Sequence, residues 1–223
     1  KIGMVFQNFA LMPHRSVLDN VAMPLEIRQV AKNERMRQAA AILDIVELGA
    51  WGSKFAHELS GGMQQRVGLA RAFATDAPIL LMDEPFSALD PLIRTDMQDL
   101  LLELQVELQK TIVFITHDLG VVAESAARVV VMYAGQVVEE GTTSDTFNHP
   151  KHPYTRGLLR SVPKLGERSR HGRTRLLEIA GMVPSLYELP EGCNFHPQFR
   201  HAMAICRETT PEFVAMGGID RVR

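Results

Sequence analysis

A short apolar run that ends in two adjacent carboxylates constrains this chain more than any other feature. Residues 79–82, Ile-Leu-Leu-Met, follow Pro78 and lead directly into Asp83 and Glu84. A run of this length without polar alternation is typical of a strand buried on both faces in a parallel sheet. The two carboxylates would then lie at the C-terminal edge of that sheet, where α/β proteins bind ligands. The pattern alone also fits an acidic pair that simply faces solvent.

The rest of the chain alternates between runs typical of strands and of helices. Residues 89–108, for example, carry apolar side chains at helical spacing over about five turns. Such alternation predicts an α/β fold with a mostly parallel sheet. We expect strands at residues 2–6, 79–82 and 112–115, helices at 33–48, 60–73 and 89–108, and a hairpin from 129–133 and 136–139.

Composition and charge exclude several classes of function. The 24 basic and 26 acidic side chains give a formal net charge of −2, which offers no bulk attraction for nucleic acid. Two cysteines are too few for a disulfide scaffold and favour a reducing compartment. No run approaches the roughly 20 apolar residues of a membrane-spanning helix, and the first residues lack the pattern of a signal peptide. We therefore expect a soluble intracellular chain that reaches a membrane only through a partner.

Residues 59–66, Leu-Ser-Gly-Gly-Met-Gln-Gln-Arg, form a glycine-rich loop that opens a helix. Gly61 and Gly62 let the backbone approach a ligand closely, and the free N–H groups at the helix start favour an anion. Ser60 adds a hydroxyl donor. The segment can therefore bind a phosphate, although the Ser-Gly-Gly core alone would fit an ordinary capped helix start equally well.

The strand-end carboxylates have two distinct chemical uses. Asp83 is suited to hold Mg²⁺, in part through water, because this ion keeps most of its hydration. Glu84 is suited to polarise an attacking water as a general base.

Two further segments follow in the sequence. Residues 87–90, Ser-Ala-Leu-Asp, end in Asp90, which local physics favours as a helix-start residue over a group that reaches across a dimer interface. Residues 115–118, Ile-Thr-His-Asp, again end a strand. His117 would lie beside the Asp83–Glu84 strand and could reach a γ-phosphate, although a lone histidine is more often structural.

The order and spacing of these segments along residues 2–141 resemble the ATP-binding subunits of ABC transporters. Residues 59–66 look like the ABC signature motif, residues 79–84 like Walker B with its catalytic glutamate, and residues 87–90 like the D-loop. His117 resembles the switch histidine, and Gln7 the Q-loop glutamine that senses Mg²⁺ and contacts the transmembrane partner. Each motif alone has a high false-positive rate, whereas the ordered set does not.

The resemblance implies a P-loop NTPase-like α/β domain. Residues 1–148 would form this partial ATPase domain, with a helical subdomain at about 15–75, and residues 149–223 a short C-terminal extension. Glu84 and His117 would be catalytic, and Mg²⁺ would bind at Asp83 and Gln7, partly through water. The residues expected to contact ATP are Gln7, Ser60, Gly61, Gly62, Gln64 and Asp90.

The resemblance also implies partners and a location. Two such domains would sandwich two ATP molecules as a homo- or heterodimer, and closure and hydrolysis would drive transmembrane permease subunits. A periplasmic or extracellular solute-binding protein would act indirectly. The subunit would lie peripherally on the cytoplasmic face of the plasma membrane.

One motif of the family is missing. Walker A, G-x-x-x-x-G-K-[ST], lies upstream of the Q-loop glutamine, and here only six residues precede Gln7. The chain therefore looks N-terminally truncated and lacks the lysine and amides that contact the β- and γ-phosphates. We expect an unpaired strand edge and uncovered apolar faces as a result.

Two substrate classes compete. Residues 2–118 resemble glycine betaine/proline importer ATPases, as in residues 9–14, Phe-Ala-Leu-Met-Pro-His, whereas residues 116–223 resemble oligopeptide/dipeptide importer ATPases, as in residues 192–197, Gly-Cys-Asn-Phe-His-Pro. We hypothesise a recombined reading frame joined near residues 115–118. Peptide import is slightly preferred because the tail is peculiar to one substrate group.

The tail raises the question of an iron–sulfur cluster. Some peptide-importer ATPases carry a cysteine cluster here, but this sequence has Cys193 and Cys206 with Phe199 where another cysteine is expected. Two thiolates cannot supply the usual four ligands, so a cluster is disfavoured. The basic residues within 164–175 are better interpreted as a solvated linker than as a contact to anionic lipid or protein.

Two rival functions remain open. One is a soluble ABC-type ATPase of translation or DNA repair, for which the peptide-importer tail is not expected. The other is a non-catalytic subunit that lends Ser60 and Gly62 to the ATP of a partner while binding none of its own.

Overall fold

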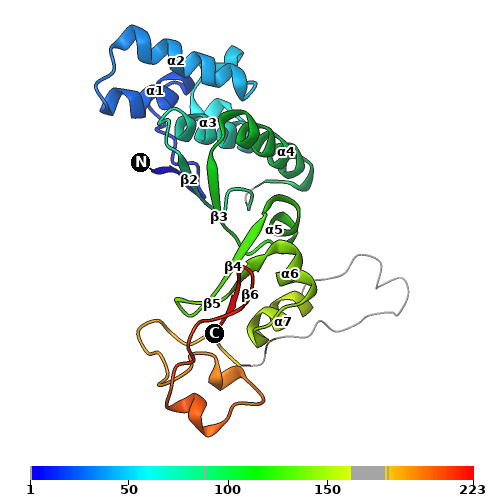
Figure 1. Cartoon of the computed structure of the whole chain (residues 1–223). Coiled ribbons are helices and arrows are strands. Elements are labelled where there is room, and N and C mark those ends of the chain that lie inside the picture. Colours follow the sequence, from blue (N-terminus) through cyan, green and yellow to red (C-terminus); the bar gives the residue numbers. More distant parts are fainter. Residues whose placement is uncertain (1, 88, 162–178, 180) are drawn as a thin grey trace. The chain divides into compact units, whose positions relative to one another are not determined.

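The computed structural model describes residues 2–87, 89–161, 179 and 181–223 (Figure 1). These residues form two compact units, Lys1–Asp118 and Leu119–Arg223. The boundary expected at residues 148 and 149 therefore lies inside the second unit, and the basic segment 164–175 lies outside the described residues. No helix in the described part of the chain is long and apolar enough to cross a membrane.

The first unit is built on a three-stranded parallel sheet. Its strands are β1 (Ile2–Val5), β2 (Ile79–Asp83) and β3 (Thr111–Ile115), in the order β1-β2-β3. The run at residues 79–82 is thus the central strand, as its apolar pattern predicts. The strands are in register, with Val5 opposite Met82 and Asp83 opposite Ile115, so that all three reach the same edge.

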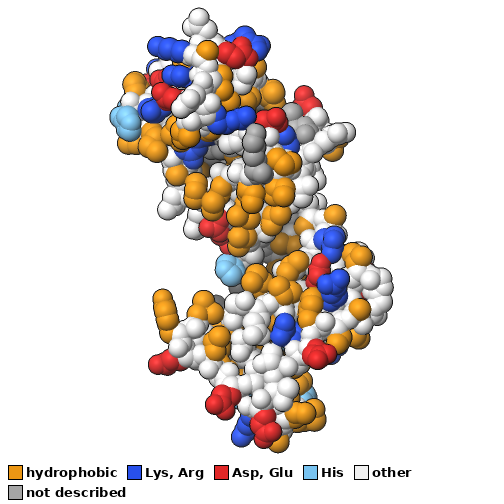
Figure 2. Space-filling model, turned by 60° about the vertical axis from the view of Figure 1, so that its left-hand side comes forward, with side chains coloured by type: hydrophobic (Ala, Val, Ile, Leu, Met, Phe, Trp, Pro, Cys, Tyr) orange, Lys and Arg blue, Asp and Glu red, His pale blue; other side chains and the backbone are white. Residues whose placement is uncertain are grey.

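One face of this sheet is buried and the other is not. Side chains alternate between the two faces, and Val5, Leu80 and Met82 are at most 1% exposed. On the opposite face Ile2, Met4, Ile79, Val113 and Ile115 are at least 39% exposed, and Leu81 is half-buried. Figure 2 shows hydrophobic side chains gathered on one face of the first unit. The expectation of an uncovered apolar face is confirmed for the described residues.

Helices cover the buried face and extend beyond it. Helix α3 (Gly61–Phe73) packs on β1, on α1 (Val17–Ile27), on α2 (Lys32–Ile45) and on α4 (Pro91–Leu108) (Figure 1). Their apolar stripes meet in one core, where Val21, Leu43 and Leu69 are at most 1% exposed.

Helix α2 ends three residues earlier than its periodicity predicts. Glu47 adopts φ 61° just after the helix, and its N–H donates to the Asp44 carbonyl. The Leu48 N–H donates to the Leu43 carbonyl at 2.8 Å. These bonds form a Schellman-type helix end. The predicted end at residue 48 was wrong because Glu47 takes the left-handed conformation.

The second unit contains an antiparallel sheet. The predicted hairpin is confirmed as β4 (Arg128–Tyr133) and β5 (Gln136–Thr142), and its turn places Ala134 and Gly135 at positive φ. Strands β7 (Asp220–Val222) and β6 (Val214–Gly217) extend the sheet in the order β4-β5-β7-β6. The tail pattern gave no signal for these last two strands. Among the described residues this unit also contains α5 (Leu119–Ser125), α6 (Thr143–Asn148), α7 (Pro153–Arg160) and the 3₁₀ turns His196–Gln198 and Ala204–Arg207.

An aromatic cluster and a buried carboxylate hold the second unit together. Phe195 packs against Tyr133, Tyr154 and Phe199. Glu139 is 3% exposed, and its carboxylate accepts the His152 N–H at 2.9 Å at the start of α7. It also accepts the N–H of residue 151. This buried charge is therefore compensated by hydrogen bonds from the backbone.

Candidate functional site

Two neighbouring strand ends bring the predicted catalytic segments together. Strand β2 ends at Asp83, which lies opposite Ile115 at the end of β3. Because the strands are parallel and in register, Glu84 and His117 both follow the same edge of the sheet. The expectation that the His117 strand neighbours the Asp83–Glu84 strand is confirmed.

Glu84 is tied to the end of β3 by three hydrogen bonds. Its backbone N–H donates to the Ile115 carbonyl at 2.8 Å. Its carboxylate accepts the Thr116 hydroxyl at 3.0 Å through Oε2 and the His117 N–H at 2.9 Å through Oε1. Glu84 adopts φ 45°, a left-handed conformation that is unfavourable for a residue with a Cβ. His117 thus contacts the Glu84 carboxylate through its backbone, while its side chain is exposed.

The loop at residues 87–90 starts helix α4. The Asp90 carboxylate accepts the N–H groups of Leu92 at 3.2 Å and Ile93 at 3.1 Å, so Asp90 is the N-cap. The helix-start interpretation of Asp90 is confirmed. The Ser87 hydroxyl donates to the Glu84 carbonyl at 3.0 Å, which ties the loop back to the end of β2.

The glycine-rich loop at the start of α3 has one open and one packed glycine. Ser60 caps the helix by accepting the Met63 N–H at 3.3 Å. A Cβ built on Gly61 meets no atom within 4 Å, whereas one on Gly62 would come within 2.6 Å of Ile93 Cγ2. Gly61 therefore leaves space for a ligand beside the backbone, and Gly62 allows α3 to lie close to α4.

The two glutamines of this segment have structural partners. The Gln64 amide donates to the carbonyls of Ala56 at 3.0 Å and Leu59 at 3.2 Å, so it points back toward the 3₁₀ turn Ala56–Glu58. Gln65 is 1% exposed and donates to the Pro85 carbonyl, directly after Glu84. Helix α3 is thereby linked to the end of β2.

Gln7 lies just beyond β1, where its side chain is exposed. The backbone that follows is held by Arg71, whose guanidinium donates to the carbonyls of Phe9 and Ala10, both at 2.6 Å. Phe9 and Ala10 have φ values of 55° and 47°. Burial lowers the pKa of Arg71 from its ordinary value, but an arginine stays charged. The charge therefore fixes the segment that presents Gln7.

The carboxylates at this edge fit a hydrated magnesium ion better than a caged metal. Asp83 is half-buried at the strand end. No group of three or more histidine, cysteine or acidic side chains in the described residues could hold a metal. Mg²⁺ commonly binds through one or two carboxylates, with water and substrate phosphates completing its shell. The two thiols of the sequence do not fit a four-ligand cluster, although the Cys193 N–H donates to the Cys206 carbonyl at 2.9 Å.

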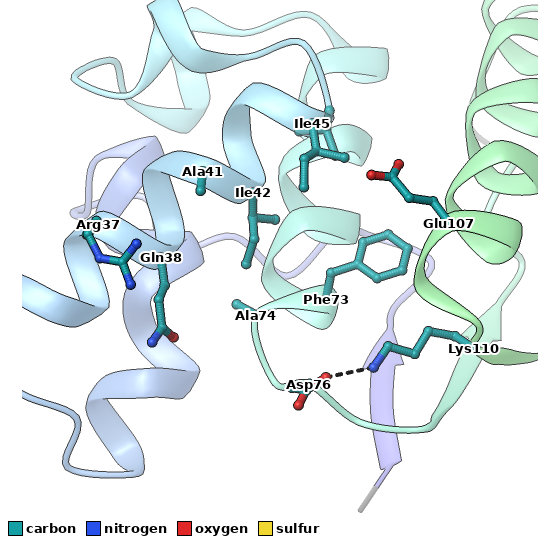
Figure 3. A pocket seen from close by; sticks show the side chains of 11 residues that line it. Arg37, Gln38, Ala41, Ile42, Ile45, Phe73, Ala74, Asp76, Glu107 and Lys110 are labelled. Carbon is teal, nitrogen blue, oxygen red and sulfur yellow. Dashed lines mark hydrogen bonds and ion pairs between the residues drawn. The ribbon is translucent and has the colours of Figure 1, made fainter.

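A pocket of about 510 Å³ lies elsewhere in the first unit (Figure 3). Its lining comes from α2 and from the C-terminal ends of α3 and α4, and includes Ile42, Phe73 and Glu107. An ion pair between Lys110 and Asp76, at 2.7 Å, lies at one side of it. None of the motif residues lines this pocket, so it does not belong to the site at the sheet edge.

Sequence reasoning missed the residues that connect the motifs. Thr116, Gln65 and Arg94 were not singled out, although each lies inside or beside a motif. Arg94 pairs with Asp118 at 2.7 Å and donates to the Leu89 carbonyl at 3.4 Å. The only signal for Arg94 is its place one helical turn after the cap Asp90, because its partner Asp118 lies beyond the end of β3, 24 residues later in the chain.

Comparisons with known proteins give two family matches. A family model for ABC transporters matches residues 1–87, and one for the C-terminal region of oligopeptide/dipeptide transporters matches residues 138–206. The dipeptide transport ATP-binding protein DppD of Haemophilus influenzae is 43% identical over 222 residues, which cover 97% of this chain and 66% of that protein. The chain thus spans about two thirds of the length of this relative.

A second relative and a solved structure complete the comparison. The glycine betaine/proline betaine transport ATP-binding protein ProV of Salmonella typhimurium is 52% identical over 162 residues, covering 73% of this chain and 40% of that protein. A dimeric post-hydrolysis structure of the ATP-binding cassette MJ0796 with ADP and Pi matches with a TM-score of 0.56 and 37% identity, covering 64% of this chain and 63% of that chain. The fold is that of an ABC ATPase domain. The two family models and these relatives identify the chain as a member of the ABC transporter family, among the importer-type ATP-binding proteins.

Proposed function

We propose that this chain is part of the ATP-hydrolysing subunit of an importer and that its cargo is an oligopeptide or dipeptide. The observation that carries the proposal is the meeting of two strand ends, where the Glu84 carboxylate lies 2.9 Å from the His117 N–H. Adjacent strand ends thus present a candidate general base and a candidate γ-phosphate contact on the same edge of the sheet, as action on one phosphate requires. The peptide cargo is supported by DppD, which matches across nearly the whole chain.

Each residue of the site has a role in this proposal. Bound ATP and Mg²⁺ supply the reactive phosphate and its charge neutralisation, and Asp83 and Gln7 hold the ion, partly through water. Glu84 polarises the attacking water, and the exposed side chain of His117 contacts the γ-phosphate. Ser60, Gly61, Gly62, Gln64 and Asp90 face the nucleotide of a second subunit. The space beside Gly61 supports this assignment, whereas the Gln64 amide would have to leave the Ala56 and Leu59 carbonyls.

The partners follow from the same proposal. The importer-type relatives support contact with transmembrane permease subunits, and the dimeric ATP-binding cassette supports pairing with a second ATPase subunit. A solute-binding protein would act on the other side of the membrane. We place the chain peripherally on the cytoplasmic face.

The test is calorimetric titration of the 223-residue chain with Mg-ATP, using Glu84→Gln to slow hydrolysis. Asp83→Asn should weaken binding, and Asp99→Asn, an exposed carboxylate on α4, is the matched control. Binding that is lost in Asp83→Asn and kept in Asp99→Asn supports the proposal. Absence of binding in every variant overturns nucleotide binding by this chain alone.

A second candidate function has its own supporting observation. The chain has no Gly-Lys pair for a phosphate-binding loop, yet its glycine-rich loop is intact and Gly61 is open. It would then lend Ser60 and Gly62 to the ATP of a partner. Mixing the chain with intact DppD and measuring ATP turnover tests this candidate. No change in turnover with rising chain concentration contradicts it.

The cargo also has an alternative. ProV matches 73% of the chain at higher identity than DppD, which favours a quaternary amine such as glycine betaine or proline betaine. Exchanging residues 15–58 or residues 149–223 into an intact peptide importer separates the two. If peptide uptake is retained after exchange of residues 15–58 but lost after exchange of residues 149–223, the result favours the amine. If uptake is lost with residues 15–58 but retained with residues 149–223, the result favours peptides.

A further inference from the structure

The Thr116 hydroxyl has two partners whose roles fix its orientation. The Asp118 N–H lies 3.0 Å from Thr116 Oγ1, and a backbone N–H can only donate. The hydroxyl proton is therefore free to point at Glu84 Oε2, also at 3.0 Å. Thr116 thus accepts on one side and donates on the other, and it connects the backbone of residue 118 to the carboxylate of Glu84.

A second link continues from Asp118 to the start of helix α4. The Asp118 carboxylate pairs with Arg94 Nη1 at 2.7 Å, and Arg94 Nη2 donates to the Leu89 carbonyl at 3.4 Å. Leu89 directly precedes the N-cap Asp90. The connection thus runs from the loop at residues 87–90 through Arg94, Asp118 and Thr116 to Glu84.

The Glu84 side chain depends on these hydrogen bonds because the backbone conformation of Glu84 is intrinsically unfavourable. At φ 45° a residue with a Cβ is held in place by its surroundings rather than by intrinsic preference. The two carboxylate oxygens are held separately, Oε1 by the His117 N–H and Oε2 by the Thr116 hydroxyl. Removing one of them would let the carboxylate rotate about the other.

We propose that Thr116 is a positioning residue for Glu84, and that the Arg94–Asp118 pair holds Thr116 in place. This inference rests on the proposed role of Glu84 as general base. A hydroxyl that donates to a carboxylate restricts its rotation and keeps the remaining lone pairs directed away from β3. The loop at residues 87–90 can thereby influence Glu84 without touching its carboxylate.

The test compares Thr116→Val, which keeps the shape and removes the hydroxyl, with Thr116→Ser, which restores it. Thr111→Val, at the other end of β3, is the matched control. Amide exchange of His117 and Asp118 is followed by NMR in the 223-residue chain, and the ¹³C-labelled Glu84 carboxyl signal is assigned by its loss in Glu84→Gln.

The proposal predicts that Thr116→Val speeds exchange at both His117 and Asp118 by about tenfold. It also predicts a displaced Glu84 signal, and restoration of both readouts in Thr116→Ser. A purely structural cap would change Asp118 alone. An unchanged His117 rate and an unchanged Glu84 signal in Thr116→Val overturn the proposal.

A functional readout separates this inference from the proposed function. If the chain binds Mg-ATP, Thr116→Val should lower turnover by about tenfold and change the binding constant by less than about twofold. Equal losses in both would overturn the positioning role. If the chain binds no Mg-ATP, the proposed function fails for this chain alone, whereas the NMR comparison still decides whether Thr116 positions Glu84.

Discussion

Each unit of the chain contains a carboxylate held by hydrogen bonds, and the two carboxylates differ in their exposure and in their donors. In the first unit the Glu84 carboxylate lies at a sheet edge, half-exposed, and takes its hydrogen bonds from a hydroxyl and a backbone N–H of the next strand end. In the second unit the Glu139 carboxylate is 3% exposed and accepts two backbone N–H groups at the start of α7. The first carboxylate remains accessible to a ligand, whereas the second anchors a helix.

The cores differ as well. The first unit buries many aliphatic side chains between α1, α2, α3 and the sheet. Each of them supplies a small part of the buried apolar surface of this unit, so truncating one removes a small fraction of it. The buried hydrophobic cluster of the second unit comprises Val131, Tyr133, Val138 and Phe195, with partly buried side chains around it. A unit held by a few large side chains should respond more strongly to one substitution.

The sequence supplies separate optical probes for this comparison. Its single tryptophan, Trp51, lies in the first unit, and its three tyrosines, Tyr133, Tyr154 and Tyr187, lie in the second. Denaturant unfolding followed by tryptophan fluorescence reports on the first unit, and tyrosine fluorescence on the second.

Phe195→Ala should have the largest effect. Phe195 is 5% exposed and contacts three other aromatic rings and His152, so truncation leaves a cavity at the centre of the cluster. We expect a loss of about 4 kcal/mol in the unfolding free energy reported by tyrosine. Met182→Ala, at an 88% exposed side chain, is the control. A loss below about 1 kcal/mol would contradict the picture of a unit held by few side chains.

Leu80→Ala should follow closely, in the first unit. Leu80 is fully buried on the central strand, and its removal should lower the unfolding free energy reported by Trp51 by about 3 kcal/mol. Val106→Ala, at a 79% exposed position of α4, should change it little. If the tyrosine signal shifted by as much as the tryptophan signal, the two units would unfold together.

Acid should destabilise the second unit through His152. Burial lowers the pKa of His152 to about 4, although the nearby Glu139 opposes part of this shift. An unfolded histidine titrates near pH 6.5, so as the pH falls the unfolded state binds the proton first. The stabilisation is complete above pH 6.5 and is lost as the pH falls to about 4. We expect a loss of about 2 kcal/mol over this range by tyrosine fluorescence.

His152→Asn provides the matched control for this pH dependence. The His152 Nδ1 accepts the Tyr154 N–H at 3.1 Å and caps α7, and asparagine can also cap a helix without titrating. The variant should remove most of the loss between pH 6.5 and 4. An unchanged pH profile would show that another group titrates.

Ser60→Ala should have the smallest effect, in the first unit. It removes the bond to the Met63 N–H, which is long at 3.3 Å, and should lower the unfolding free energy by about 1 kcal/mol or less by tryptophan fluorescence. Ser60→Asp keeps a cap but places a negative charge where a phosphate would bind. If Ser60→Asp stabilised the chain like serine yet still supported stimulation of a partner, Ser60 would be a cap only.

The sequence predicted the architecture of the first unit better than its contacts. The central place of β2 and the N-cap role of Asp90 follow from local patterns, an unbroken apolar run and a carboxylate before a proline-led helix. The Thr116 bond was not predictable in this way, because it depends on the register of β2 and β3 and on the left-handed conformation of Glu84. The same holds for Gln65, whose partner lies 20 residues away.

The second unit was less predictable for a different reason. Strand β6 is exposed along its whole length, so no hydrophobic alternation marks it. Strand β7 has three residues and pairs with β5, which lies about 80 residues earlier in the chain. Local sequence carries little information about such a distant partner.

The uncovered face of β1, β2 and β3 has a consequence for any measurement on this chain in solution. An apolar sheet face of this kind joins readily to another copy, and such encounters grow with the square of the chain concentration. Light scattering and unfolding midpoints should therefore vary with dilution. Rate constants for ATP turnover or amide exchange become properties of the single molecule only when they are extrapolated to low concentration.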